Sequence, residues 1–96
     1  QIVRAEAFGN FTRLFIGEEM YLFSGGIGRL SEILGEANFL RIHRSHLIRT
    51  NEVAKIRKKG KTFYVQLRND EELPVGAKQQ EAVLALALVE DVPNHQ

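Results

Sequence analysis

The sequence contains no cysteine, so it can form no disulfide framework, no cysteine zinc site and no thiolate nucleophile. It also lacks a long hydrophobic run, because its longest apolar stretch, residues 82–89, is far shorter than the ~20 residues of a membrane-spanning helix. No basic flank followed by an apolar run stands at its start, so we expect no signal peptide. These absences exclude a disulfide-stapled scaffold and a membrane-spanning chain, and we expect a cytoplasmic protein.

The apolar content that is present suffices for one core. A length of 96 residues and a hydrophobic content of 44% predict a single globular domain over residues 1–96, with too little chain for a second core. Glutamine at position 1 suggests that this domain is a fragment of a longer protein.

Charge is strongly polarised along the chain, although the formal net charge is only +1. Residues 41–68 hold nine basic side chains and one acidic side chain, a net charge of +8. The other residues hold four basic and eleven acidic side chains, a net charge of −7. A basic segment of this kind favours a polyanion, either nucleic acid or an anionic membrane surface. The alternative is a solvated strand pair whose lysines prevent edge-to-edge aggregation.

Alternation of apolar and polar residues, separated by glycine and asparagine turn signals, predicts a strand-rich chain. Residues 24–28, SGGIG, interrupt the alternation, and Ser24 could cap the helix that follows. No GK[ST] follows this loop, so we expect a hinge and cap there rather than a phosphate loop. Gly35 is placed to end that short helix, and Lys78–Glu90 should form the longest helix. The expected strands are residues 2–8, 11–16, 19–23, 53–59, 61–68 and 72–75.

The most informative stretch is Phe39–Arg49, FLRIHRSHLIR, which mixes apolar anchors with hydrogen-bond donors. No acid within the stretch orients His43 or His46 as a general base, and Ser45 lacks the glycine frame of a nucleophile elbow. A metal ion would need a third ligand from Glu52 or from a distant carboxylate. We therefore expect a binding segment, with no enzyme activity, metal, cofactor or small-molecule substrate.

Several of these features occur together in one known family. The segment FLRIHRSHLI at 39–48, preceded by a short helix and followed by a basic hairpin and LPV at 73–75, resembles the LytTR DNA-binding domain. The segment AEAFGNFTRLF at 5–15 is similar to that family's early strand–turn–strand, and the resemblance covers residues 2 to about 88. It implies a mainly β fold of small antiparallel sheets with one short central helix and a C-terminal helix. It also implies the output domain of a bacterial transcription regulator, which often carries a receiver domain upstream.

The resemblance further implies that loops, rather than a recognition helix, enter successive major grooves of double-stranded DNA. It places Thr12 at a base-contacting position of the first loop and Arg44 at the contacting position of the second. In the third loop, Lys78 matches a position usually held by arginine. The residues expected to contact DNA are Asn10, Thr12, Arg13, His43, Arg44, Ser45, Arg49, Lys58, Lys59, Lys61 and Lys78.

The chain departs from the family pattern at three places. His46 stands where the family commonly has an aromatic residue, and Arg49 stands where it has asparagine. Gly76-Ala77 replaces the favoured Ser-Arg, which leaves Lys78 as the main donor of the third loop. Lysine binds phosphate but lacks the bidentate fork of arginine. We therefore expect DNA binding more firmly than any particular base contact.

Other interpretations remain open at the level of the sequence. His43 could be a structural residue that bonds the loop backbone, and Arg41 could be only a solvated strand residue. The whole chain could be a protein-interaction module that docks its apolar last helix on a partner. It could also be a non-specific RNA or membrane-surface binder that uses the basic hairpin alone. The expected partners are double-stranded DNA, an upstream receiver or sensor domain, and a second copy on tandem half-sites.

Overall fold

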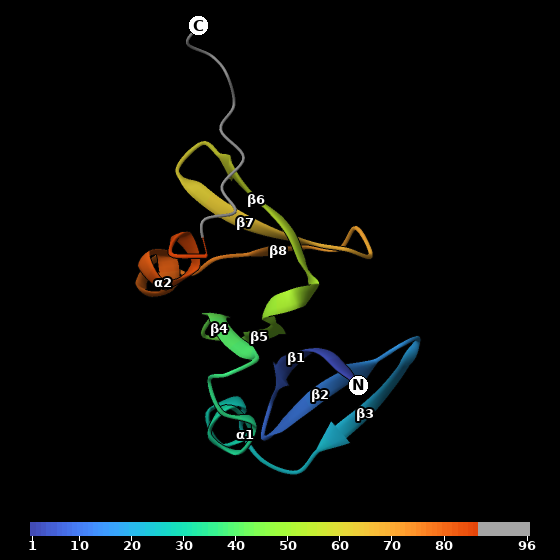
Figure 1. Ribbon diagram of the computed structural model, residues 1–96. Helices are drawn as coiled ribbons and strands as arrows, with labels where there is room; N and C mark the ends of the chain where they lie inside the picture. Colours follow the sequence, from blue (N-terminus) through green and yellow to red (C-terminus); the bar gives the residue numbers. More distant parts are fainter. Residues whose placement is uncertain (87–96) are drawn as a thin grey trace, which may run out of the picture.

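The computed structural model describes residues 1–86, which form two antiparallel sheets and two short helices. The five-stranded sheet has the order β3-β2-β1-β5-β4, and the three-stranded sheet has the order β6-β7-β8. Figure 1 shows the first sheet with α1 in the lower half of the molecule and the second sheet with α2 in the upper half. The elements are β1 Ile2–Phe8, β2 Phe11–Ile16, β3 Glu19–Phe23, α1 Ile27–Leu34, β4 Phe39–His43, β5 His46–Arg49, β6 Val53–Lys59, β7 Thr62–Leu67, β8 Glu72–Pro74 and α2 Gln80–Leu84, with 3₁₀ turns at Thr50–Glu52 and Ala77–Gln79.

Three of the hairpins are closed by two-residue turns that begin with glycine. Gly9, Gly17 and Gly60 have φ values of 62°, 61° and 64°, a conformation that costs other residues backbone strain. Such turns match the right-handed twist of the flanking strands, so they fix the registers of β1–β2, β2–β3 and β6–β7. The tight turns expected from the sequence are confirmed at these positions.

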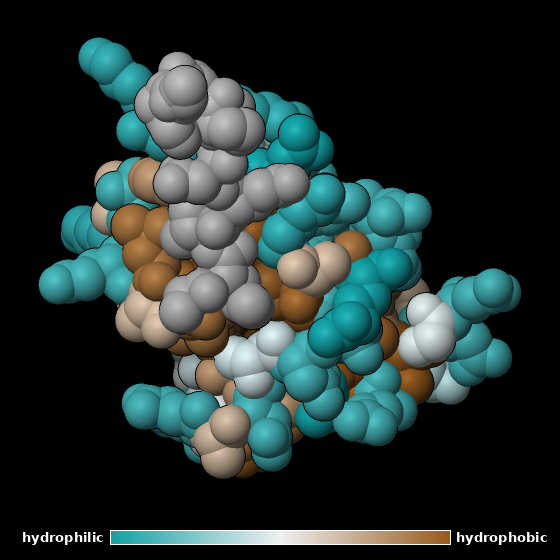
Figure 2. All heavy atoms as spheres, turned by 45° about the horizontal axis from the view of Figure 1, so that its top comes forward, coloured by the Kyte–Doolittle hydropathy of each residue, from teal (hydrophilic) through white to brown (hydrophobic). Residues whose placement is uncertain are grey.

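The hairpin of β4 and β5 lies between two hydrophobic cores and contributes to both. Phe39 and Leu47 pack with Ala5 and with the apolar stripe of α1, Ile27 and Leu30. Successive residues of a strand face opposite sides, so Ile48, next to Leu47, belongs to the other core. That second core contains Ile42, Ile48, Val53, Ile56, Val65, Leu67, Leu73, Val75 and Val83. In the view of Figure 2, hydrophobic residues gather toward the middle and hydrophilic ones project at the periphery.

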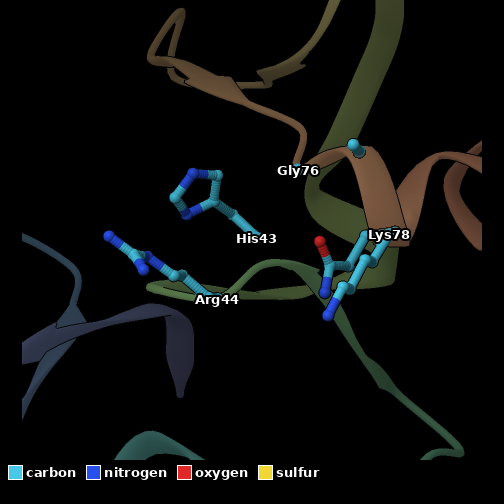
Figure 3. A pocket seen from close by; sticks show the side chains of 6 residues that line it. His43, Arg44, Gly76 and Lys78 are labelled. Carbon is cyan, nitrogen blue, oxygen red and sulfur yellow. The ribbon is translucent and has the colours of Figure 1, made fainter.

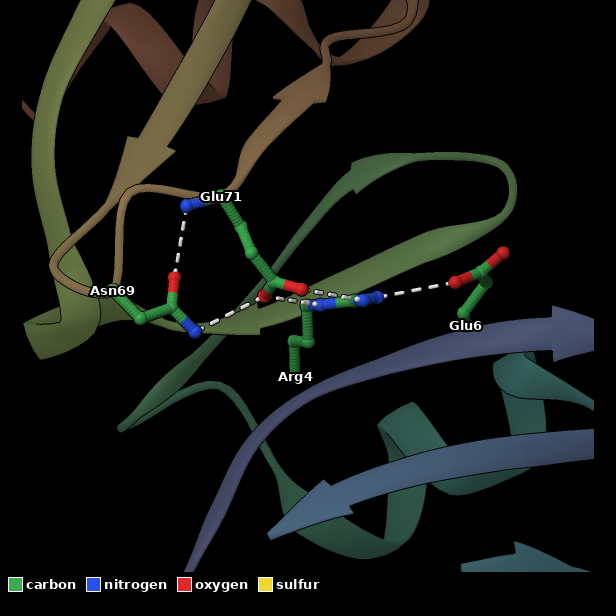
Figure 4. A network of polar contacts seen from close by, with 4 residues as sticks. All are labelled: Arg4, Glu6, Asn69 and Glu71. Carbon is green, nitrogen blue, oxygen red and sulfur yellow. Dashed lines mark hydrogen bonds and ion pairs between the residues drawn. The ribbon is translucent and has the colours of Figure 1, made fainter. Parts of the chain in front are cut away.

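A buried arginine links the two sheets. Arg4 of β1 is 7% exposed, and its Nε and Nη2 donate to the two carboxylate oxygens of Glu71 at 2.9 and 3.1 Å. Its Nη1 donates to Glu6 at 3.1 Å, and its guanidinium carbon lies 3.9 Å from the centre of the Phe15 ring. Glu71 is held in turn by Asn69, which donates to it from its side-chain amide and accepts from its backbone N–H (Figure 4). The two sheets are therefore joined by polar contacts as well as by the shared hairpin.

The mainly β fold with one short central helix is confirmed, with two corrections and one open point. Ser24 does not cap α1, because Gly26 occupies the N-cap and no side chain bonds the first turn. The expected strands 61–68 and 72–75 are slightly shorter, because β7 spans Thr62–Leu67 and β8 ends at Pro74. The helix expected at Lys78–Glu90 is a 3₁₀ turn followed by α2, and its part from residue 87 onward lies outside the described residues. No helix within residues 1–86 is long and apolar enough to cross a membrane.

Candidate nucleic-acid interface

Three loops from distant parts of the chain meet at one edge of the molecule. The backbone N–H of Ala7, near the end of β1, donates to the Ser45 carbonyl at 2.9 Å, which ties the first turn to the second. The Gly76 N–H donates to the Ile42 carbonyl at 2.8 Å, which ties the segment after β8 to the same turn. We name residues 9–10, 43–45 and 76–78 together the contact edge. Backbone bonds alone thus gather the three loops that the sequence singled out.

The second and third loops enclose a shallow cavity of about 360 Å³. Figure 3 shows the side chains of His43 and Arg44 on one side and that of Lys78 on the other. Arg44 and Lys78 are exposed, and neither side chain forms a hydrogen bond or ion pair with another of the residues 1–86. A hollow lined by uncommitted cationic groups suits an anion. The residues that line it are His43, Arg44, Gly76, Ala77, Lys78 and Gln79.

His43 combines a structural role with a free donor. Its Nδ1 accepts a hydrogen bond from the backbone N–H of Ser45 at 3.1 Å. The neutral ring therefore carries its proton on Nε2, which is left to donate outward. The neighbouring His46 ring lies 5.3 Å away between centroids, and burial lowers the pKa of His46 below its usual 6.5. His46 thus belongs to the support of the edge, whereas the structural interpretation of His43 is compatible with an outward contact.

Three lysines at the tip of the β6–β7 hairpin, Lys58, Lys59 and Lys61, lie near the third loop. They differ in whether an acidic side chain pairs with them. The Val75 N–H donates to the Phe63 carbonyl at 2.9 Å, so the hairpin adjoins the segment that leads to Lys78. Lys59 pairs with Glu72 at 2.7 Å. The ammonium of Lys58 lies 5.5 Å from the Phe63 ring centre with no acidic partner among the described residues, and Lys61 is exposed. Of the three lysines nearest the hairpin tip, Lys58 and Lys61 have no acidic partner among the described residues and could meet a phosphate.

Thr12 and Arg49, which were expected to contact DNA, are both engaged inside the fold. The Thr12 side chain is fully buried, and its hydroxyl donates to the Gly25 carbonyl at 2.9 Å. Arg49 lies at the end of β5 opposite the contact edge, where its Nε donates to the Ile2 carbonyl at 2.7 Å and its guanidinium covers Phe39. Both residues are used inside the fold, because each hydrogen-bonds a backbone carbonyl. We therefore place neither on the candidate interface.

Of the other residues expected in the first loop, Asn10 lies in the turn and Arg13 lies within β2. Asn10 is exposed in the turn, one residue beyond Gly9. The guanidinium carbon of Arg13 lies 3.9 Å from the centre of the Phe8 ring. The Arg13 Nε is buried and has no hydrogen-bond partner within residues 1–86. Asn10 is thus the more accessible donor, because it is exposed whereas Arg13 is partly buried.

Two arginines with clear roles were missed at the level of the sequence. Arg4 alternates with small apolar residues and gives no signal of its ion pair with Glu71, 67 positions away. Arg41 has the spacing of a solvated strand residue, yet it hydrogen-bonds the carbonyls of His43 and Arg44. Only the folded geometry identifies either residue. No group of three His, Cys, Asp or Glu side chains in the described part of the chain could hold a metal ion.

Comparison with known proteins agrees with this arrangement. The chain is similar in structure to the LytTr DNA-binding domain of a methyl-accepting/DNA response regulator from Bacillus cereus, with a TM-score of 0.79 and 22% sequence identity. That likeness covers 90% of this chain and 80% of the other. No curated protein shows significant sequence similarity to the chain. The family model of the LytTr DNA-binding domain matches residues 1–87. The chain therefore belongs to the LytTr DNA-binding domain family, whose members bind DNA.

Proposed function

We propose that this domain binds double-stranded DNA sequence-specifically by placing the contact edge in successive major grooves. The observation that carries the proposal is the gathering of Asn10, Arg44 and Lys78, from three separate loops, at one edge. A protein without a recognition helix in the groove can contact bases through such loops if they are held rigidly. The described helices are short, with five and eight residues, and neither belongs to the contact edge.

Charge supports the same orientation on DNA. The segment 41–68, with its net charge of +8, contains the second loop and the basic hairpin. Phosphates attract such a surface at a distance, and each neutralised phosphate releases counterions, which favours binding. Lys58 and Lys61 have no acidic partner among the described residues, so they are the hairpin's candidates for phosphate contacts. The polarised charge therefore orients the domain, while the contact edge supplies base contacts.

Within the contact edge, Arg44 is the candidate for base recognition. Its guanidinium is exposed and uncommitted, and arginine can donate two parallel hydrogen bonds to O6 and N7 of guanine. The Nε2–H of His43 can donate to a neighbouring acceptor. Lys78 binds as a point charge and suits a phosphate better than a base edge.

The structural neighbour, which is described as a domain of a response regulator, supports a proposal about the wider setting. We propose that this domain likewise serves as the DNA-binding output of a bacterial regulator in the cytoplasm. An upstream receiver or sensor domain would control it, and two copies would occupy tandem half-sites. Two equally spaced repeats among selected DNA sequences would support the pairing, and a single isolated motif would contradict it.

The first test is selection of binding sites from random duplex DNA, followed by affinity measurements on the selected site. For Arg44→Ala we expect a loss of about 1–3 kcal/mol and relaxed preference at one base position, as for a bidentate base contact. Arg68→Ala is the matched control, because Arg68 is exposed but adjoins the turn between β7 and β8, at the end of that sheet away from the contact edge. If Arg44→Ala weakens binding equally on all sequences, Arg44 contacts a phosphate. If no motif is enriched from the random pool, specific DNA binding by this domain is wrong.

A further inference from the structure

The turn that presents Arg44 is built differently from the other hairpin turns. The described residues form four hairpins with two-residue turns, and three of them begin with a glycine of positive φ. The fourth, Arg44-Ser45, contains no glycine, and neither of its residues has a positive φ. Two-residue turns without positive φ splay their strands and are disfavoured. Something other than local backbone preference must therefore hold residues 43–45.

A bulge in β4 prepares this unusual turn. Arg41 pairs with Leu47 and His43 pairs with His46, so Ile42 is the extra residue on its strand. Its carbonyl is free of the β4–β5 pairing and accepts the hydrogen bond from Gly76. The bulge thereby directs one carbonyl toward the third loop. The carbonyls of His43 and Arg44, at the turn itself, have hydrogen-bond partners of their own.

Arg41 supplies those partners with a single side chain. Its Nε donates to the His43 carbonyl at 3.0 Å, and its Nη2 donates to the Arg44 carbonyl at 2.7 Å. These are charge-assisted bonds from a rigid planar fork, which is stronger and more directional than a neutral donor. With the bond from Ser45 N–H to His43 Nδ1 and the bond from Ala7 to Ser45, the turn is held from both strands and by its own side chain.

We propose that Arg41 is a positioning residue for DNA recognition, which clamps the 43–45 turn so that Arg44 is presented in one geometry. The inference rests on the proposed function. Two donors of the Arg41 guanidinium are engaged by the backbone carbonyls that carry Arg44, so in this proposal Arg41 acts through Arg44. A rigid turn also lowers the entropy lost when the side chain engages a base. Lysine keeps the charge of Arg41 but lacks the planar fork whose Nε and Nη2 bond the two carbonyls in fixed directions.

The test compares Arg41→Lys with Arg68→Lys on the selected site and on unrelated duplex DNA. Arg68 is a matched control, because its Nε also donates to a backbone carbonyl, that of Asn51 at 2.8 Å, away from the contact edge. We expect Arg41→Lys to weaken specific binding by about tenfold or more, as for the loss of a charge-assisted bond. Binding to unrelated DNA and the slope of log affinity against log salt should stay unchanged, because no phosphate contact is lost. The control should match the wild type in all three measurements.

A second measurement tests the clamp without DNA. Backbone ¹⁵N relaxation of the free domain should show His43–Ser45 as rigid as the flanking strands in the wild type and more mobile in Arg41→Lys. If this turn is equally rigid in both proteins and specific affinity is unchanged, the inference about Arg41 is overturned while DNA binding stands. A lower salt slope in Arg41→Lys, with equal losses on both DNAs, would make Arg41 a phosphate contact and also overturn it. If the wild type itself shows no specific binding, the proposed function fails, whereas the relaxation data still decide whether Arg41 holds the turn.

Discussion

Exposure separates the arginines of this domain into different roles. Arg4 is 7% exposed and forms ion pairs with Glu71 and Glu6, so its charge joins the two sheets and is not available to a ligand. Arg44 is exposed and uncommitted, which leaves its donors for a ligand. Arg41 is intermediate, because it is partly exposed and bonds the backbone that carries Arg44. The same residue type thus serves as a joint, a support and a contact, according to where the fold places it.

The Arg4–Glu71 pair gives a prediction about pH at the scale of single residues. The hydrogen bonds from Arg4 lower the pKa of Glu71 below its usual 4.5. A carboxyl with a depressed folded-state pKa stabilises the fold above its unfolded pKa, and this stability is lost as pH falls through the folded pKa. We therefore expect Glu71→Gln to lower the free energy of unfolding by about 1–2 kcal/mol at pH 7, less than for a fully buried pair because Glu71 keeps contact with water. Chemical denaturation at several pH values measures this.

The difference in the free energy of unfolding between the wild type and Glu71→Gln should disappear as pH falls below the folded pKa of Glu71. The wild-type carboxyl is then neutral as well. Glu72→Gln is the neighbouring control. Its carboxylate pairs with the half-exposed Lys59, and such pairs contribute about 0–1 kcal/mol. Equal stability of Glu71→Gln and the wild type at pH 7 would mean that the Arg4–Glu71 contact does not join the sheets energetically.

At the scale of elements, α1 is bounded by backbone geometry rather than by side-chain caps. No side chain bonds its first turn, and Gly35 ends it with φ 78° and ψ 177°, a region that is accessible almost only to glycine. The Gly35 N–H donates to the Ser31 carbonyl at 2.9 Å, which closes the last turn. The helix is held mainly by Ile27 and Leu30, which are buried against the five-stranded sheet.

Two glycines of this region should respond in opposite directions to the same substitution. For Gly35→Ala we expect a loss of about 1–3 kcal/mol in the free energy of unfolding, because alanine is strained at this φ and ψ. For Gly28→Ala, inside α1 with open space around it, we expect a gain of about 0.5–1 kcal/mol from helix propensity. Thermal unfolding of both variants checks the pair. A stable Gly35→Ala protein would show that the end of α1 can rearrange without cost.

At the scale of the whole molecule, the basic hairpin tip and the cavity of the contact edge lie on the same side. In Figure 1 the tip of the β6–β7 hairpin, α2 and the turn between β4 and β5 lie toward the left, whereas the β2–β3 and β7–β8 turns project to the right. The left side carries the free hairpin lysines and the cavity between His43 and Lys78. The Arg4–Glu71 contact and the shared β4–β5 hairpin fix the two sheets relative to each other. The proposed DNA contacts of the hairpin and of the contact edge therefore lie on one side of the molecule.

The salt dependence of DNA binding should separate the hairpin lysines. For Lys61→Gln and Lys58→Gln we expect uniform weakening on all DNA sequences and a slope of log affinity against log salt that falls by about 0.9 each. Lys59→Gln should change the slope less, because Glu72 already neutralises that ammonium. Titrations from low to physiological salt measure the slopes. Unchanged slopes in both Lys58→Gln and Lys61→Gln would place the hairpin away from the DNA.

The sequence by itself determined the features that depend on near neighbours along the chain. Alternation of apolar residues sets the strands, glycine at the first turn position sets three hairpins, and the basic residues of 41–68 set the charge. The pattern within 39–49 also placed Arg44 among the residues left to face water, and Arg44 is exposed. Each of these properties follows from local sterics or from composition, so it survives without knowledge of the fold.

Only the tertiary structure decided which polar residues remain available to a ligand. Thr12 and Arg49 are residue types that can contact DNA. In the fold, however, Thr12 donates to the Gly25 carbonyl and Arg49 donates to the Ile2 carbonyl. Arg4 and Arg41 have the pattern of solvated strand residues, yet one joins the sheets and the other holds the turn of Arg44. A hydrogen bond needs a partner at the right distance in space, and strand pairing and sheet packing bring distant residues to that distance. The contact edge exists for this reason, because its loops meet only after both sheets have formed.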